Sequence, residues 1–324
     1  MNTIDQRGAL EPAADAAAFR TGPSAVETAG PSAVATAGPS AVTTAGPSAI
    51  ATAGSSTVAT ARPSAIAVTG PSDLAETGTE PAAVGIDLGS GYTRIWASGR
   101  PLVQLPSLND SLSNPRPLLR RGRIVDTNGL RTLLARVLSR YQRPLPAGAV
   151  VVACRPVLSR AADDDAMRDL LRTVFEPSRL LVTPTIRAAA IGAGAAPGPL
   201  LIADVGAHLI EVALLADGGL ITARQANIGI RDLTGPTADD IVVHTITELV
   251  QDLRRDPQAR DVDAAAAHRG MVLVGGGANA PDLATRTAAA LRLPVRSARR
   301  PRVAAVHGAG LSALAAVRRG PHRR

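Results

Sequence analysis

Two stretches of the chain share one pattern of apolar and polar positions. Residues 82–89 (AAVGIDLG) and 199–206 (PLLIADVG) are each an apolar run that ends at glycine. Each is followed by a segment in which apolar and polar residues alternate, residues 92–98 (YTRIWAS) and 209–216 (LIEVALLA). A short apolar run bounded by turn residues indicates a buried strand, and alternation indicates a strand with one buried face. The sequence therefore predicts the same strand–turn–strand unit twice.

Further strands and helices alternate around these units. Helical periodicity is clearest at residues 129–141, where one face carries Leu130, Leu133, Leu134, Val137 and Leu138. The same criteria predict helices at residues 163–175, 186–195, 237–255, 282–293 and 303–319, and strands at residues 149–156, 179–184, 219–226 and 271–277.

This order predicts an α/β fold built from a duplicated unit, with a central cleft between two lobes. We expect lobe I to span residues 81–198 and to be completed by the C-terminal helix at 303–318. Lobe II is expected at residues 199–302, and residues 319–324 form a basic tail.

The first eighty residues have a different character. Residues 22–77 are seven tandem octapeptides of the type GPSAVATA. A proline in almost every repeat blocks a continuing helix and removes a donor from any strand ladder, and little in each repeat is worth burying. Residues 1–80 are therefore predicted to be a disordered arm. Its Ser and Thr residues could be phosphorylated or the arm could act as a tether; the alternative is replication slippage in a tolerated tail.

Composition narrows the chemistry. All 35 basic residues are arginine, so no lysine is available as a Schiff base, a general base or a P-loop cation. Aromatic residues make up only 2% of the chain, so the core must consist of Leu, Val, Ile and Ala. Cys154 is the only cysteine, which excludes a disulfide within the chain and suits a reducing cytoplasm. The chain also shows no signal peptide and no apolar run of membrane-spanning length, which predicts a cytoplasmic protein.

The net charge of +8 is placed unevenly. No acidic residue follows Asp282, whereas this end of the chain carries Arg286, Arg292, Arg296, Arg299, Arg300, Arg302, Arg318, Arg319, Arg323 and Arg324. An Arg-rich end of this kind favours an anionic partner such as a membrane surface, a nucleic acid or an acidic protein. The alternative is a solvated tail without a partner.

Both predicted hairpin turns carry an aspartate two residues before a glycine. Glycine lets a backbone approach phosphate oxygens closely, and two carboxylates that face each other across a cleft can hold Mg²⁺ through water. We therefore expect phosphate contacts from Asp87, Gly89, Ser90, Gly91 and Tyr92 in the first turn and from Asp204, Gly206, Ala207 and His208 in the second. Asp87 and Asp204 are the candidate metal ligands, and no residue is predicted to be catalytic.

A third glycine-rich turn follows the apolar run at residues 271–274. Gly275, Gly276, Gly277 and Ala278 are placed to contact the sugar and the α-phosphate of a nucleotide. The alternative for three consecutive glycines is a tight turn without a ligand.

With these motifs in order, the chain resembles the actin, Hsp70 and sugar-kinase superfamily and, within it, the MreB/Mbl family of bacterial actin homologues. GIDLGSGYT resembles the first phosphate loop, IADVGAHLIEVALL the second, and GMVLVGGGANAPDL the adenosine motif. The resemblance covers residues 82–317 and implies a duplicated actin-like, ribonuclease-H-like fold. It also implies ATP with Mg²⁺ as cofactor, self-association into filaments, and partners among cell-wall synthesis or other MreB-type proteins.

The chain departs from the family pattern at several places. Ala207, His208, Leu209 and Ile210 stand where the family has glycines and threonines, which predicts a weakened nucleotide site. Residues 183–185 lack the carboxylate that positions the attacking water in the family, so hydrolysis should be slow or absent. Only residues 104–123 and 255–269 stand where the two small subdomains, IB and IIB, should be, so both are expected to be reduced or absent.

The leading functional hypothesis is an MreB-like scaffold of rod shape, cell morphogenesis and cell-wall synthesis with a weakened ATP-binding cleft. In this hypothesis, the protein lies at the inner face of the membrane and contacts the membrane through its Arg-rich end. One alternative is an active ATPase or kinase of the actin superfamily. Another is a basic membrane-binding or nucleic-acid-binding module on an actin scaffold.

Overall fold

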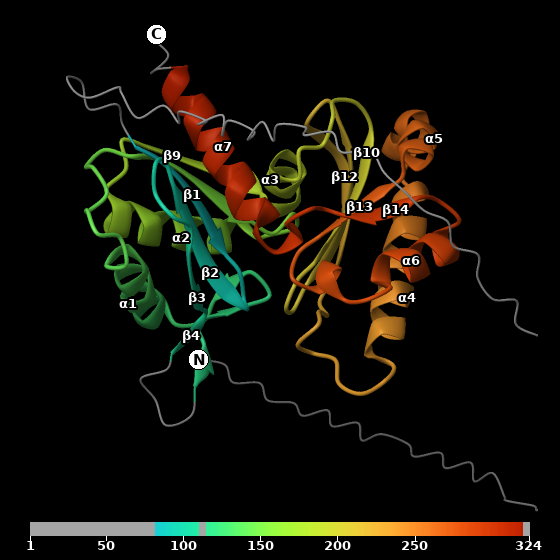
Figure 1. Ribbon diagram of the computed structural model, residues 1–324, viewed down its shortest axis with the longest axis horizontal. Helices are drawn as coiled ribbons and strands as arrows, with labels where there is room; N and C mark the ends of the chain where they lie inside the picture. Colours follow the sequence, from blue (N-terminus) through green and yellow to red (C-terminus); the bar gives the residue numbers. More distant parts are fainter. Residues whose placement is uncertain (1–81, 110–114, 320–324) are drawn as a thin grey trace, which may run out of the picture. The chain divides into compact units, whose positions relative to one another are not determined.

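Two five-stranded sheets form the framework of the protein (Figure 1). The computed structural model describes residues 82–109 and 115–319. The first sheet has the order β3-β2-β1-β8-β9, with β1 (Ala83–Leu88), β2 (Tyr92–Ala97), β3 (Val103–Pro106), β8 (Val150–Arg155) and β9 (Arg179–Pro184). The second has the order β12-β11-β10-β13-β14, with β10 (Leu200–Val205), β11 (Ile210–Ala216), β12 (Gly219–Ala226), β13 (Met271–Val274) and β14 (Val295–Ser297).

The two sheets repeat one connectivity. In each sheet the central strand, β1 or β10, pairs antiparallel with the strand that follows it and parallel with a strand reached by a crossover, β8 or β13. All six residues of β1 are buried, and β10 has one residue that is only partly buried. A strand covered on both faces is expected to be an apolar run, which is the pattern of residues 82–89 and 199–206. The predicted duplication of the α/β unit is confirmed.

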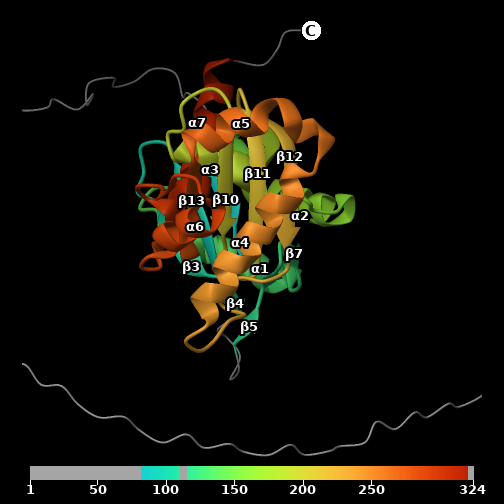
Figure 2. The same cartoon turned by 90° about the vertical axis from the view of Figure 1, so that its right-hand side faces the viewer.

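Helices cover both outer faces of the pair of sheets and fill the space between them (Figures 1 and 2). α1 (Thr127–Leu138) and α2 (Ala161–Phe175) pack on the first sheet. α4 (Ala238–Arg254), α5 (Arg260–Arg269) and α6 (Leu283–Leu291) pack on the second. α3 (Thr185–Gly192) and α7 (Ala304–Arg318) share a core with residues of both sheets.

The contact between α3 and α7 is unusually close because both helices present small residues. A Cβ placed on Gly308 would lie 1.8 Å from the carbonyl oxygen of Ala188, and one placed on Gly192 would lie 1.9 Å from that of Ala304. No side chain fits at such distances, so only glycine allows the two backbones to pack in this way. The core shared by both sheets is accordingly rich in alanine.

The segments that replace the two small subdomains are short, as the sequence predicts. The first contains the two-residue strands β4 (Leu108–Asn109), β5 (Arg116–Pro117), β6 (Leu119–Arg120) and β7 (Arg123–Ile124), which form two small hairpin sheets. The second contains the 3₁₀ turn η1 (Pro257–Ala259) and α5. Two further 3₁₀ turns are η2 (Gly277–Asn279) and η3 (Pro301–Val303).

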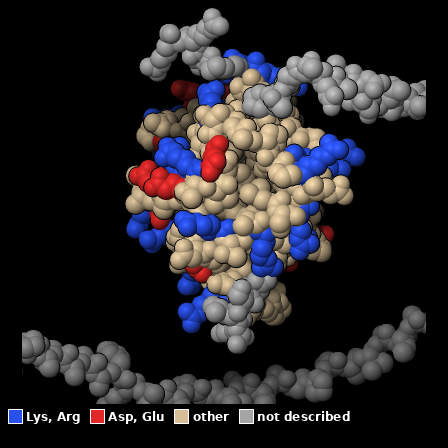
Figure 3. Space-filling model, turned by 90° about the vertical axis from the view of Figure 1, so that its left-hand side faces the viewer, with Lys and Arg blue, Asp and Glu red and all other residues tan. Residues whose placement is uncertain are grey.

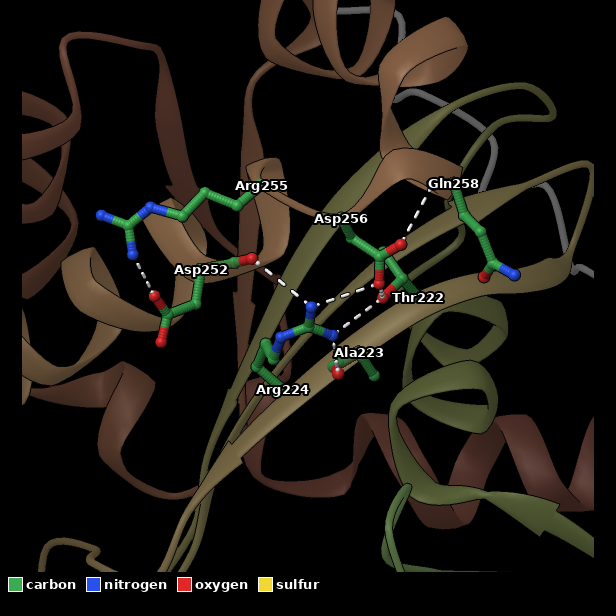
Figure 4. A network of polar contacts seen from close by, with 7 residues as sticks. All are labelled: Thr222, Ala223, Arg224, Asp252, Arg255, Asp256 and Gln258. Atoms are coloured by element: carbon green, nitrogen blue, oxygen red, sulfur yellow. Dashed lines mark hydrogen bonds and ion pairs between the residues drawn. The ribbon is translucent and has the colours of Figure 1, made fainter.

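A polar network fixes the second of these segments to the sheet (Figure 4). The guanidinium group of Arg224 on β12 donates to the carboxylate of Asp256 at 3.2 Å and to the carbonyl oxygen of Asp252 at 3.4 Å. The hydroxyl of Thr222 donates to the same Asp256 carboxylate at 2.6 Å. These hydrogen bonds hold the end of α4 and the turn that follows it against β12.

All the predicted helices and strands are present within a few residues of their expected bounds. Sequence patterns missed β3 to β7, β14 and α5, which are short or, in the case of α5, rich in alanine and weakly amphipathic. The predicted arm at residues 1–80, its repeats at 22–77, and residues 320–324 of the basic tail lie outside the described residues. Among the helices that the structure describes, none is long and apolar enough to cross a membrane.

Candidate functional site

A cavity of about 310 Å³ opens where the hairpin turns of the two sheets meet. Residues from the β1–β2 turn, the β10–β11 turn and the end of β13 line it, together with residues from α3 and from the start of α7. Eleven of the thirteen residues predicted from the sequence are among its lining residues: Asp87, Gly89, Ser90, Gly91, Tyr92, Asp204, Gly206, Ala207, His208, Gly275 and Gly276.

The other two predicted residues, Gly277 and Ala278, lie beside the cavity in η2 and do not line it. A Cβ on Gly277 would lie 2.4 Å from Cγ1 of Val205, and Ala278 is 3% exposed. The carbonyl oxygen of Ala278 accepts a hydrogen bond from the Ser297 hydroxyl at 2.9 Å. Gly277 and Ala278 therefore have a packing role, and ligand contacts from this turn are left to Gly275 and Gly276.

The two hairpin turns have the same hydrogen bond. The backbone N–H of Gly89 donates to the carbonyl oxygen of Tyr92 at 3.1 Å, and that of Gly206 donates to the carbonyl oxygen of Leu209 at 2.8 Å. Between these ends, the backbone N–H groups of Ser90, Gly91, Ala207 and His208 donate to no other described residue. Successive unpaired N–H groups beside a cavity can bind an anion.

The two hairpins also share one register, but the residues at one position have opposite charge. Asp87 lies opposite Arg94 across β1 and β2, whereas Asp204 lies opposite Glu211 across β10 and β11. Arg94 Nη1 donates to Asp87 Oδ2 at 3.1 Å, and both side chains are 12% exposed. Arg94 Nε donates to Gln104 Oε1 at 3.3 Å. The first aspartate is thus paired with a cation from its own hairpin.

Burial disfavours the charged form of the acidic residues in the cavity and raises their pKa values. Burial, with a smaller contribution from the Asp87 carboxylate, raises the pKa of Asp204 to about 7. Burial and the nearby Asp204 raise the pKa of Glu211 to about 8. Burial also raises the pKa of Asp87, an effect that Arg94 partly offsets. Glu211 is therefore largely protonated at neutral pH.

Contacts across the cavity join the two halves of the molecule. The Glu211 carboxyl group accepts a hydrogen bond from the backbone N–H of Val157 at 2.6 Å, which links β11 to the segment after β8. At the turns, a Cβ on Gly91 would lie 3.1 Å from Cβ of Ala207. The two turns are therefore in contact distance of each other, and a ligand of the cavity would touch both.

Two arginines, one from each half of the molecule, lie close to the ring of Tyr92. The guanidinium carbon of Arg94 lies 5.4 Å from the centre of the Tyr92 ring, and that of Arg231 lies 5.5 Å from it. Both distances are in the range of a cation–π interaction. Arg231 forms no ion pair with any described residue.

The His208 side chain is directed to a partner on its own half. Its Nδ1 lies 2.7 Å from Asp232 Oδ1, and the other carboxylate oxygen of Asp232 accepts the backbone N–H of Gly229 at 3.0 Å. The ring is therefore fixed beside the cavity, and the residue's backbone N–H rather than its imidazole is placed to meet a phosphate.

The donor set does not fit a magnesium ion. Asp87 is already paired with Arg94, so of the two expected ligands only Asp204 has no ion-pair partner among the described residues. Within residues 82–109 and 115–319, no group of three or more His, Cys, Asp or Glu side chains is placed to hold a metal ion. The expected role of Asp87 and Asp204 as metal ligands finds no support in this geometry.

The start of α3 supplies no group to activate water. Thr185 lines the cavity, but its hydroxyl donates to the carbonyl oxygen of Arg155 at 2.9 Å, and Thr183 and Pro184 are not acidic. Glu211 is the one glutamate among the lining residues; its pKa, raised to about 8, leaves it largely protonated at neutral pH, and its carboxyl group accepts the hydrogen bond of the Val157 N–H.

Sequence patterns missed four charged residues of the cavity, Arg94, Glu211, Arg231 and Arg302. A signal for the first two is present, because a four-residue turn in a hairpin fixes its register and places the residue seven positions after each aspartate opposite it. No local signal places Arg231, which follows β12 and reaches Tyr92 only through the tertiary fold.

Solved structures with the same arrangement of sheets include MreB5 of Spiroplasma citri bound to AMPPNP, with a TM-score of 0.63 and 15% identity over 76% of this chain and 100% of that one. The MamK double helical filament has a TM-score of 0.62 and 16% identity over 72% of this chain and 99% of that one. The ethanolamine utilization protein EutJ from Carboxydothermus hydrogenoformans has a TM-score of 0.53 and 16% identity over 71% and 89%.

No protein-family model and no curated protein sequence matches the chain. The structural likenesses confirm the resemblance at the level of the fold, which is actin-like.

Proposed function

From this actin-like fold we propose that the protein binds a nucleotide in the cavity between its two sheets and acts as a self-associating scaffold rather than by rapid turnover. We propose that this scaffold acts in cell shape and cell-wall synthesis, which is the role that the MreB resemblance implies. A similar structure, that of MreB5, is bound to AMPPNP, and another is a double helical filament of MamK.

One observation carries the nucleotide part of the proposal. The two hairpin turns, formed by equivalent residues, place the unpaired N–H groups of Ser90, Gly91, Ala207 and His208 around one cavity. Two such turns on opposite sides suit a chain of phosphates, whose oxygens accept hydrogen bonds on every side. Gly275 and Gly276 extend the lining at the end of β13, beside Ile230 and Pro301, which offer apolar surface to a base.

The scaffold part rests on what the cavity lacks. Thr183, Pro184 and Thr185 at the start of α3 supply no carboxylate where the resemblance implies a water-positioning one, and Glu211 is largely protonated at neutral pH. Bound ATP should therefore persist, and an assembly that depends on it should be long-lived. This disfavours the alternative of an active ATPase or kinase.

The face drawn in Figure 3 does not favour the alternative of a basic membrane-binding or nucleic-acid-binding module. Arginines there form separate patches divided by uncharged surface, and acidic side chains lie beside some of them. A polyanion would need a continuous basic surface. Contact of the Arg-rich end with an anionic membrane remains a proposal, to be checked by co-sedimentation with vesicles that contain or lack anionic lipid.

Nucleotide binding and self-association are tested together by titration calorimetry and sedimentation. The proposal predicts that ADP and AMPPNP bind and that AMPPNP increases the fraction of protein that pellets. Adenosine, which lacks phosphate, should bind at least tenfold more weakly, a difference of about 1.4 kcal/mol. Equal pelleting with and without nucleotide would contradict the link to assembly, and absence of binding would contradict the nucleotide site.

A further inference from the structure

We propose that the cleft binds its phosphate-bearing ligand without a divalent metal ion, and that the guanidinium groups of Arg94 and Arg231, which both lie near the ring of Tyr92, supply the positive charge. This inference rests on the proposed function, because it concerns how the same cavity holds an anionic ligand. It differs from the metal-dependent binding that the resemblance implies.

The first step is the occupation of Asp87. A carboxylate that holds a metal or its waters must present its oxygens to them, but Asp87 Oδ2 accepts a hydrogen bond from Arg94 Nη1 at 3.1 Å. Both side chains are largely shielded from water, with 12% exposed, so the pair is not readily opened. The guanidinium group thus takes the place next to Asp87 that a hydrated cation would need.

The second step is the donor capacity that Arg94 keeps. Its Nη1 and Nε are engaged by Asp87 and Gln104, and its Nη2 donates to no described residue. Arg94 and Asp87 both line the cavity. A guanidinium group has donors on three nitrogens and stays charged at any pH that a protein meets, so Arg94 can hold Asp87 and a phosphate at the same time.

The third step is the second arginine. Arg231 comes from the other half of the molecule, its guanidinium carbon lies 5.5 Å from the centre of the Tyr92 ring, and it has no acidic partner among the described residues. Its guanidinium carbon would lie 3.5 Å from a Cβ on Gly91, beside the unpaired N–H groups of the first turn. Two guanidinium groups on one ring repel each other, and an anion between the turns would remove that repulsion.

Two of the three acidic residues of the cavity are already engaged. Asp87 is paired with Arg94, and the Glu211 carboxyl group accepts a hydrogen bond from the Val157 N–H. Since the chain has no lysine, arginine is the only side chain that can supply a permanent positive charge. Bidentate donors are also the usual partners of phosphate oxygens.

The test is a calorimetric titration of the full chain with ADP and with inorganic triphosphate, each in chelator and in millimolar magnesium. We expect the affinity of ADP to change by less than about threefold between the two buffers, and triphosphate to bind in chelator. Arg231→Ala should weaken both ligands by roughly tenfold, because it removes one charge-assisted contact. The matched control is Arg296→Ala on β14, an exposed arginine outside the cavity, which should leave both affinities unchanged.

The outcomes separate this inference from the proposed function. Binding of ADP in magnesium but not in chelator would overturn the metal-free site and leave the nucleotide site standing. Equal loss of affinity in Arg231→Ala and Arg296→Ala would overturn the role of Arg231, since a general effect of charge would then suffice. No binding in either buffer would overturn the proposed function and this inference with it.

Discussion

Arg94 and Glu211 occupy the same position in two copies of one hairpin. Each lies opposite the aspartate of its own hairpin, Asp87 or Asp204, and each aspartate is followed two residues later by the glycine that begins the turn. One copy therefore contains an ion pair, and the other contains two carboxyl groups, that of Glu211 buried and that of Asp204 partly buried. This difference sets the charge of the cavity and leads to the first two predictions.

Replacing Arg94 by Ala should destabilise the protein by about 3 kcal/mol, because it leaves the buried Asp87 without its partner. The double variant Arg94→Ala/Asp87→Asn should recover most of that loss, since the remaining amide carries no charge. Urea denaturation followed by circular dichroism measures both. Equal stability of the single and the double variant would show that the ion pair does not matter to the fold.

Stability should fall as the pH rises from about 4 to about 8. Burial raises the pKa of Asp204 to about 7 and that of Glu211 to about 8, so between their ordinary values and these values the folded state binds more protons than the unfolded state. The free energy of unfolding then decreases with pH across this window and levels off above it. We expect a loss of roughly 3 kcal/mol between about pH 5 and about pH 9, measured by urea denaturation.

Glu211→Gln is the control for this pH dependence. The amide oxygen can still accept the hydrogen bond from the Val157 N–H, but the side chain no longer titrates. The variant should show a clearly shallower slope above about pH 6. An unchanged slope would assign the effect to other groups.

Gly308→Ala should destabilise the protein by about 2 kcal/mol or more, because its Cβ would lie 1.8 Å from the Ala188 carbonyl oxygen. Helix propensity alone predicts the opposite sign, a gain of about 1 kcal/mol for alanine over glycine in a helix. The sign of the change in thermal midpoint therefore decides whether the close contact of α3 and α7 governs this position. Leu311→Ala on the same helix, at a residue that is 37% exposed, should have a much smaller effect.

The protein should release phosphate from ATP no faster than buffer does while it still binds AMPPNP. The physical reason is the lack of a carboxylate at the start of α3, where Thr183, Pro184 and Thr185 stand. A phosphate-release assay at saturating ATP measures this. Sustained release by the wild-type protein that disappears in a variant of the cavity, such as Glu211→Gln, would contradict the interpretation.

Most of the fold could be predicted from the sequence because its signals are local. Residues 82–89 and 199–206 are apolar runs that end at glycine, and strands buried on both faces require such runs. To predict the pairing of Asp87 with Arg94, the register of the hairpin must be inferred as well. The approach of Arg231 to Tyr92 and of Gly308 to Ala188 depends on how distant segments pack, and no local pattern encodes it.

The limits of sequence patterns are clearest at the expected metal site. Two aspartates in matching turns indicate a shared cation when only their spacing is considered. In the structure, the first is paired with Arg94 and burial raises the pKa of the second to about 7. The environment of each carboxyl group, rather than its presence, decides what it can bind.

The central claim, that Arg94 rather than a metal on Asp87 meets the ligand's charge, is tested most directly by the affinity of Asp87→Asn for ADP in chelator. The account predicts binding several-fold tighter than that of the wild-type protein, because the variant removes a carboxylate next to the phosphates and frees Arg94 Nη1 to donate to them. Binding weakened by tenfold or more, about 1.4 kcal/mol, would contradict the account and restore Asp87 as a direct participant in ligand binding.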